Sequence, residues 1–251
     1  MQSRIKHINK IDLIADVISD PEVVFMFPNA EKLDPPLMML DEANIGYSNG
    51  IEILHRASIN IDLETRIALI GPNGAGKSTL VKALMGDLEI TDGKRFIHNR
   101  LRVGVFTQHH MDSLDLKMSA VEQMRAKFPG ESVETFRFHL GAFGISNYFA
   151  LCPMYLLSGG QKSRVSFAII TWEKPHILML DEPTNHLDFD AINALIVGLH
   201  NFEGGLVVVS HDEYFLNALC DNLFVVDNKK VERFDGDLKD YRKSIMKTLK
   251  F

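Results

Sequence analysis

The chain has 251 residues, of which 46% are hydrophobic, enough for one large domain or two small ones with a buried core. Its formal net charge of −6 argues against a protein whose whole surface binds nucleic acid. No stretch approaches the roughly 18 apolar residues of a membrane span, and the first residues carry charges where a signal peptide needs an apolar core. The two cysteines, Cys152 and Cys220, exclude a disulfide framework and lack the spacing of a zinc site. We therefore expect a soluble, cytoplasmic protein.

The beginning of the chain differs in composition from the rest. It is basic and polar at first, then contains the apolar run VVFMFP, and four prolines lie between Pro21 and Pro36. This composition predicts the end of a linker and one added strand over residues 1–36, ahead of a domain formed by residues 37–251.

Short β-rich runs follow, LMMLDEANIGY and RASINIDLETRIALIG, separated by polar turns. The run RIALI leads into a glycine loop, GPNGAGKST, at residues 71–79. After it, Leu80, Ala83 and Leu84 have helical spacing, and the helix is expected to end near Gly86. The predicted order is therefore strand, glycine loop, helix.

The second half of the chain alternates helical and strand patterns. Apolar residues at three- and four-residue steps predict a helical subdomain over about residues 111–165, with a break at Pro129 and Gly130. Two apolar runs, HILML and LVVVS, suit strands buried on both faces of a parallel sheet. The tail predicts a hairpin around Asp227 and Asn228, followed by a basic, solvated helix.

The glycine loop has the spacing G-x-x-x-x-G-K-[ST] of a phosphate-binding loop. Its backbone N–H groups can curl around phosphates, Lys77 reaches the β- and γ-phosphates, and Ser78 ligates Mg²⁺. A glycine turn that binds nothing is the alternative, which the flanking strand and helix disfavour. The residues expected at the nucleotide are Gly71, Pro72, Asn73, Gly74, Ala75, Gly76, Lys77, Ser78 and Thr79.

A second motif, HILMLDEP, supplies carboxylates that the glycine loop lacks. Asp181, at the end of an apolar strand, is the candidate for the carboxylate on the Mg²⁺ side. Glu182 beside it is the candidate for polarising an attacking water. A solvent-facing acidic pair is the alternative, and the presence of Lys77 in the same chain disfavours it.

Four motifs in this order, the glycine loop, LSGGQ, LMLDEP and SHD, resemble the nucleotide-binding domain of the ATP-binding cassette superfamily. The resemblance covers roughly residues 37–241. It implies an α/β fold, a P-loop NTPase domain of the ABC type with an antiparallel β subdomain and a helical subdomain. It also implies an ATPase with ATP and Mg²⁺ as cofactors.

The same resemblance assigns roles to single residues. Gln108 matches the glutamine that senses Mg²⁺ and the attacking water, and Asp181 matches the metal-side aspartate. Glu182 matches the catalytic base, and His211 matches the histidine that contacts the γ-phosphate. Tyr47 matches the aromatic residue on which adenine stacks, with an ordinary strand aromatic as the alternative.

In this superfamily two domains pack head to tail, so that the LSGGQ loop of one caps the γ-phosphate bound by the other. The residues that would cap a partner's ATP are Ser158, Gly159, Gly160 and Gln161. Asp188 matches the loop that crosses to the partner. The resemblance thus implies two half-sites and no complete site in one copy, with the positive end of a helix near the cap.

The motif DEPTNHLD and the tail VERFDGDLKDYRKS resemble the ABC-F group of tandem-domain ATPases. The segments FHLGAFGIS and LSGGQKSRVSFA resemble eukaryotic members linked to general control of translation. These likenesses imply the second domain of a longer protein that acts on the ribosome, with its first domain, or a second copy of the fragment, as partner.

Three alternatives to this interpretation stay open. A natural half-length protein would also fit the sequence. The ATPase subunit of a membrane ABC transporter would share the same motifs. A nucleotide-gated clamp would use ATP binding rather than turnover, although the intact Glu182 and His211 disfavour an inactive ATPase.

Overall fold

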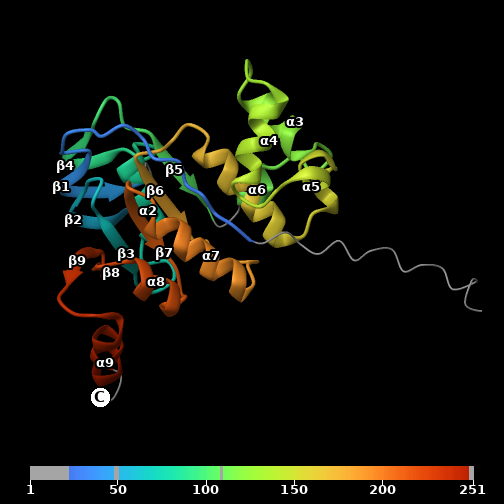
Figure 1. The fold of residues 1–251 in the computed structure, drawn as a ribbon. Coiled ribbons are helices and arrows are strands. Elements are labelled where there is room, and N and C mark those ends of the chain that lie inside the picture. Colours follow the sequence, from blue (N-terminus) through green and yellow to red (C-terminus); the bar gives the residue numbers. More distant parts are fainter. Residues whose placement is uncertain (1–22, 48–50, 108–109, 249–251) are drawn as a thin grey trace, which may run out of the picture.

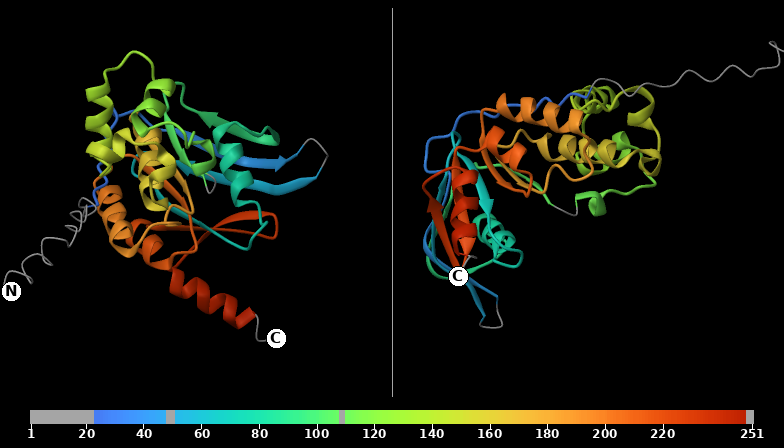
Figure 2. Two further views of the ribbon diagram at one scale, coloured as in Figure 1. Left: turned by 90° about the vertical axis from the view of Figure 1, so that its right-hand side faces the viewer. Right: turned by 90° about the horizontal axis from the view of Figure 1, so that it is seen from below.

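The computed structural model describes residues 23–47, 51–107 and 110–248 (Figure 1). Two β-sheets with packed helices form one part of the molecule, and a cluster of short helices forms a lobe beside them. The three-stranded sheet and the helical lobe lie at opposite ends of the molecule in Figure 1 and in the right-hand view of Figure 2. No helix among the described residues is both long and apolar enough to cross a membrane.

The smaller sheet is antiparallel, in the order β2-β1-β4. Its strands are β1 (Met38–Gly46), β2 (Glu52–Ile61) and β4 (Ile90–Ile97). Apolar residues of β1 and β2 form a core with Leu80 and Leu84 of the helix after the glycine loop, α2 (Lys77–Met85). The helix ends, as predicted, at Gly86, which has a left-handed φ of 87°.

The larger sheet has the order β5-β6-β7-β3-β8-β9, and only its β8–β9 pair is antiparallel. Its strands are β5 (Val103–Phe106), β6 (Ile177–Asp181), β7 (Gly205–Val209), β3 (Arg66–Ile70), β8 (Asn222–Asp227) and β9 (Lys230–Phe234). The buried runs of β6 and β7 confirm the prediction of strands covered on both faces. The predicted hairpin is also present, and its two turn residues, Asn228 and Lys229, have φ values of 47° and 63°.

Helices fill the stretch predicted to be helical. They are α3 (Ala120–Lys127), α4 (Val133–Gly141) and α5 (Asn147–Leu151), with short turns at His110–Ser113 and Met154–Leu156. The last helix, α6 (Gly159–Thr171), continues beyond the predicted end at residue 165. Three more helices follow the strands of the large sheet, α7 (Phe189–His200), α8 (Glu213–Leu219) and α9 (Leu238–Thr248).

Residues 23–36, which we call the strap, form no strand, so the prediction of an added strand in VVFMFP was wrong. The N–H of Met26 donates to the carbonyl of Ala142 in the helical lobe, 2.9 Å away, and not to a sheet. Aromatic packing decides the path instead, because Phe25 and Phe27 are buried edge-on against Phe167 of α6. The segment follows the side-chain core and not a sheet edge.

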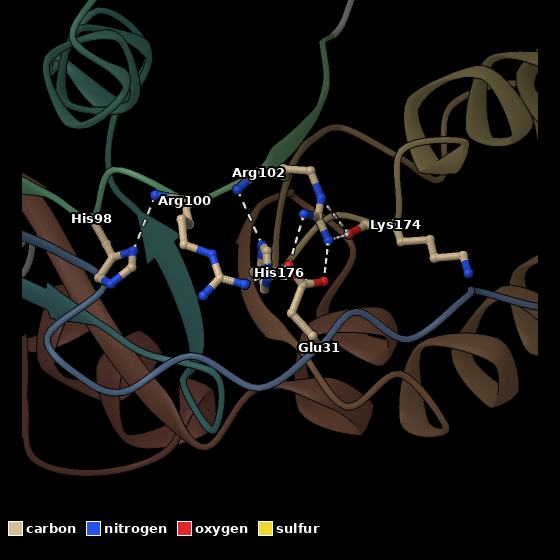
Figure 3. A network of polar contacts seen from close by, with 6 residues as sticks. All are labelled: Glu31, His98, Arg100, Arg102, Lys174 and His176. Carbon is tan, nitrogen blue, oxygen red and sulfur yellow. Dashed lines mark hydrogen bonds and ion pairs between the residues drawn. The ribbon is translucent and has the colours of Figure 1, made fainter.

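The strap then crosses to the sheets, where Glu31 meets a polar network (Figure 3). The guanidinium of Arg102 donates to both carboxylate oxygens of Glu31, at 2.6 and 3.0 Å, and also to the carbonyl of Lys174. The hydrogen bond from Arg102 lowers the pKa of Glu31 to about 2. Farther on, Leu33 is buried in the core of the antiparallel sheet. The strap therefore ties the helical lobe to both sheets.

Candidate active site

The glycine loop joins β3 to α2, and its backbone needs glycine at defined positions. Gly71, Gly74 and Gly76 have φ values of 146°, 79° and 108°, in the left-handed region that L side chains rarely adopt. A Cβ atom at Gly71 would collide with the carbonyl oxygen of Val226. This conformation turns the loop around the N-terminus of α2, where backbone N–H groups are available to an anion.

Lys77, the first residue of α2, lies folded over the loop. Its ammonium donates to the carbonyl oxygens of Gly71 and Pro72, at 2.8 and 3.0 Å. Burial lowers the pKa of Lys77, and the charges of Asp181 and Glu182 act in the opposite direction. A phosphate in the loop would offer this ammonium a charged acceptor in place of two neutral carbonyls.

The two carboxylates stand where β6 ends. The backbone N–H of Glu182 donates to the carbonyl of Val209 at 2.8 Å, which continues the pairing of β6 with β7 by one residue. Glu182 has a φ of 52°, and its side chain is only 15% exposed. Burial raises the pKa of Glu182, and the nearby His211 partly opposes this shift. A carboxylate with a raised pKa is a stronger base than an ordinary one.

Two residues of the SHD motif lie against this carboxylate. The hydroxyl of Ser210 donates to Oε2 of Glu182 at 3.5 Å, and Nε2 of His211 lies 3.8 Å from Oε1. Sequence reasoning included His211 and missed Ser210, although Ser210 stands in the same motif. Ser210 directly precedes His211, and this adjacency is the sequence signal that indicates its place at the site.

A cavity of about 630 Å³, which we call the nucleotide cavity, brings most of the predicted catalytic residues together. Its lining residues are Ile53, Asn73, Gly74, Gly76, Lys77, Ser78, Thr79, Asp181, Glu182, Asn185, Val209 and His211. Gly71 and Pro72 line a neighbouring cavity beside α9, and Ala75 packs on the core of the small sheet. Tyr47 is 42% exposed at the end of β1 and does not line the nucleotide cavity. Gln108 lies outside the described residues.

The donor set of this cavity fits Mg²⁺. A hydroxyl from Ser78 and a carboxylate from Asp181 line the same space, and hard oxygen ligands are those that Mg²⁺ prefers. Within the described part of the chain, no group of three or more His, Cys, Asp or Glu residues is placed to hold a metal ion. At nucleotide sites Mg²⁺ is held by few protein ligands, and phosphates and waters supply the remaining ligands.

The LSGGQ loop begins α6 with a capping box. The backbone N–H of Gln161 donates to the Ser158 hydroxyl at 3.2 Å, and the backbone N–H of Ser158 donates to Oε1 of Gln161 at 3.0 Å. Gln161 is buried within this arrangement. The Ser158 hydroxyl accepts in the cap and keeps its own hydrogen for a ligand.

This loop opens into a different cavity of about 750 Å³, which we call the signature cavity. Its lining residues are Val23, Ser158, Gly159, Gly160, Arg164, His186, Asp188, Asp190, Ala191 and Asn193. It shares no lining residue with the nucleotide cavity. A Cβ atom at Gly159 would lie 3.3 Å from Cβ of His186, so the loop approaches closely at that point.

The segment between β6 and α7 runs past both cavities. Asn185 lines the nucleotide cavity, and the next residue, His186, lines the signature cavity. Asp188 then caps α7 by accepting the backbone N–H of Ala191 at 2.8 Å. Consecutive residues therefore line different cavities.

Comparisons with known proteins agree with this geometry. The ABC transporter family model matches residues 54–185, more than half of the chain. The mouse ATP-binding cassette sub-family F member 3 is 47% identical over 243 residues, which are 96% of this chain and 34% of that protein. Protein GCN20 of Saccharomyces cerevisiae is 44% identical over 247 residues, which are 98% of this chain and 33% of that protein. The chain spans about a third of the length of these relatives.

Solved structures show the same fold. The dimeric, post-hydrolysis structure of the cassette MJ0796, bound to ADP and Pi, aligns with a TM-score of 0.65 at 22% identity over 80% of this chain and 100% of that one. The cbiO1 protein of Clostridium perfringens aligns with a TM-score of 0.69 at 25% identity over 86% of this chain and 95% of that one. The predicted fold class is confirmed. The relatives of this chain include members of subfamily F, and the chain belongs to the ABC transporter family and is an ATPase domain.

Proposed function

We propose that this domain hydrolyses Mg·ATP at a site completed by a second ABC domain. The observation that supports this most directly is the separation of the two half-sites. The nucleotide cavity holds Lys77, Asp181 and Glu182, whereas the LSGGQ loop opens into a cavity that shares no residue with it. An ATP held by one chain therefore meets the LSGGQ loop of another domain.

In this mechanism the glycine loop and Lys77 bind the β- and γ-phosphates, and adenine stacks on Tyr47. Ser78 and Asp181 would hold Mg²⁺, which neutralises the charge that develops on the phosphates. Gln108 would contact the metal and the attacking water.

Glu182 accepts the proton as the oxygen of water bonds to the γ-phosphorus and the bond to the β-phosphate oxygen breaks. Its raised pKa suits this role, and Ser210 holds one of its oxygens. His211 contacts the γ-phosphate from the same chain. From the partner, Ser158 and the amides that begin α6 stabilise the negative charge of the transferred group.

We further propose that the domain works in the cytoplasm, as the second ABC domain of a longer, soluble protein that acts on the ribosome. This proposal rests on the likeness to subfamily F and on a chain that spans about a third of the relatives' length. The first domain of that protein, or a second copy of this chain, would be the partner. The role of transporter subunit draws support from the fold alone, because the transporter cassettes are only 22–25% identical.

A dilution series of ATP turnover tests the composite site. We expect the rate per chain to rise with protein concentration, because each site needs a second domain, and to vanish when Mg²⁺ is chelated. The variant Lys77→Ala is the control for contaminating activity. A rate per chain that stays constant over the series would contradict the proposal. Nucleotide-dependent sedimentation of the full-length protein with ribosomes tests the proposed partner.

A further inference from the structure

Two exposed aromatic rings lie against each other at the beginnings of α7 and α8. The ring centroids of Phe189 and Tyr214 are 6.0 Å apart with an angle of 28° between the planes. Phe189 is 67% exposed and Tyr214 is 54% exposed. The Tyr214 hydroxyl donates to Oδ1 of Asn193 at 2.8 Å, which fixes the ring over the first turns of α7. Two side-chain contacts thus join these helices at the surface.

Neither ring lines a cavity, but each stands close in sequence to residues that line a different one. Phe189 follows Asp188, and both Asp188 and Asn193 line the signature cavity. Tyr214 follows His211 by three residues, and His211 lines the nucleotide cavity. The ring pair therefore connects the helix that lines the signature cavity, α7, with the segment that carries His211 of the nucleotide cavity.

The position of the His211 side chain is set mainly by the backbone that carries it. Its side chain is 69% exposed, and 3.8 Å from Glu182 is too long for a hydrogen bond. The segment around it is held by short-range contacts, since the N–H of Asp212 donates to the Ser210 hydroxyl at 3.1 Å. A displacement of the first turn of α8 would carry this short segment with it.

We propose that Phe189, Asn193 and Tyr214 are positioning residues that couple the two half-sites within one chain. Phosphate contact at His211 shifts the start of α8, and the ring pair with its hydrogen bond passes this shift to the first turns of α7. The wall of the signature cavity is thereby set according to the nucleotide in the chain's own loop. This inference rests on the proposed function.

Three variants and one control isolate the link. Tyr214→Phe removes the hydrogen bond and keeps the ring, whereas Phe189→Ala removes the ring contact. Phe189→Tyr keeps an aromatic ring and should behave as the wild type. Tyr148→Phe, at another exposed tyrosine in the helical lobe, is the matched control. We expect Tyr214→Phe and Phe189→Ala to lower turnover at saturating ATP by about three- to ten-fold, with KM changed less than about two-fold.

Hydrogen exchange supplies a readout that needs no turnover. At a concentration where light scattering shows monomers, Mg·ATP should slow exchange over residues 71–79 directly and over residues 186–193 through the link. We expect Tyr214→Phe and Phe189→Ala to keep the first effect and lose the second.

Three results would overturn the inference. Protection over residues 71–79 without protection over residues 186–193 in the wild type shows that the half-sites are not linked. Equal protection in wild type and variants shows that the rings do not carry the link. If protection is unchanged and only association of chains is weakened, the rings act between domains. Absent protection over residues 71–79 in the wild type would instead reject ATP binding, and with it the proposed function.

Discussion

The two cavities of this chain, which we propose as half-sites, are built by different means. The nucleotide cavity relies on backbone in the left-handed region, at Gly74, Gly76 and Glu182, and on charged groups withdrawn from water. The signature cavity is formed at an ordinary helix start, in which Ser158 and Gln161 close a capping box, and only its opposite wall has a left-handed residue, His186 with a φ of 67°. One cavity presents an ammonium with a lowered pKa and a carboxyl with a raised pKa. The other presents a hydroxyl and backbone amides.

This difference separates chemistry from recognition. Buried charges with shifted pKa values cost stability and are found where bonds are made and broken. A capped helix start is stable without a ligand and needs only to meet a phosphate. We therefore expect the largest losses of turnover from substitutions in the nucleotide cavity, and we expect substitutions at the LSGGQ loop to act on the partner's ATP.

The largest effect is expected for Glu182→Gln. The amide keeps the shape of the side chain but cannot accept a proton, so turnover should fall by roughly 10²–10⁴-fold. ATP binding should survive, because Lys77, Ser78 and Asp181 are untouched. Light scattering with Mg·ATP should then show a longer-lived pair of chains. Wild-type turnover and no stronger association in this variant would remove Glu182 from the role of base.

The next largest effects are expected for one variant in each proposed half-site. Lys77→Ala should weaken ATP binding by about 10- to 150-fold, since a bond to a charged partner is worth about 1.5–3 kcal/mol. Ser158→Asp keeps a good helix cap but places a negative charge against the γ-phosphate of the partner, so turnover should fall about 10-fold while ATP binding is unchanged.

A mixture of these two impaired variants should have a higher turnover than either variant alone. In a mixed pair, the glycine loop of the Ser158→Asp chain is intact and meets the LSGGQ loop of the Lys77→Ala chain, which is also intact. Steady-state turnover of the mixture, compared with each variant alone at the same total concentration, measures this. Failure to recover any activity would contradict the assignment of the two loops to different ATP sites.

A smaller effect concerns the pH dependence of turnover. Glu182 acts as a base only when deprotonated, and burial raises its pKa, so activity should fall on the acid side at a pH above the range of an ordinary glutamate. The hydrogen bond from Ser210 lowers this pKa, and Ser210→Ala should therefore move the acid limb to higher pH. A pH profile at saturating ATP tests both statements. If the acid limb of the pH profile were unchanged in Ser210→Ala, the Ser210 hydroxyl would not act on the pKa of Glu182.

The smallest effect concerns Glu31 of the strap, which lines neither cavity. Glu31 has a pKa lowered to about 2 by Arg102, so its contribution to stability is present above the unfolded value of about 4.5 and is lost as the pH falls toward 2. Glu31→Gln should lower the melting temperature slightly at pH 7 and by less at pH 3. Glu131→Gln, at an exposed carboxylate in the helical lobe, is the control, and turnover should not change. If Glu31→Gln lowered the melting temperature by the same amount at pH 7 and pH 3, the ion pair with Arg102 would be contradicted.

The sequence by itself determined the parts that depend on neighbouring residues. The glycine loop and the end of α2 at Gly86 follow from glycines that allow a left-handed φ at fixed positions. The β8–β9 hairpin was predicted around Asp227 and Asn228, and its turn lies one residue later, at Asn228 and Lys229. The strands β6 and β7 follow from unbroken apolar runs. The order of four motifs was enough to predict the family and the ATPase activity. It also named most residues that line the nucleotide cavity, although Ile53, Asn185 and Val209 were not among those predicted.

Only the tertiary structure decided how distant segments meet. The apolar run in the strap fits a strand by local pattern, yet Phe25 and Phe27 are buried among aromatic rings of the helical lobe. The ion pair of Glu31 with Arg102 joins residues 71 positions apart, and no spacing rule foretells such a contact. The separation of the two cavities likewise depends on how the segment after β6 packs against the LSGGQ loop. Local structural preference depends on residues that are neighbours in the sequence. These contacts depend instead on side-chain packing between segments that meet only in the folded chain.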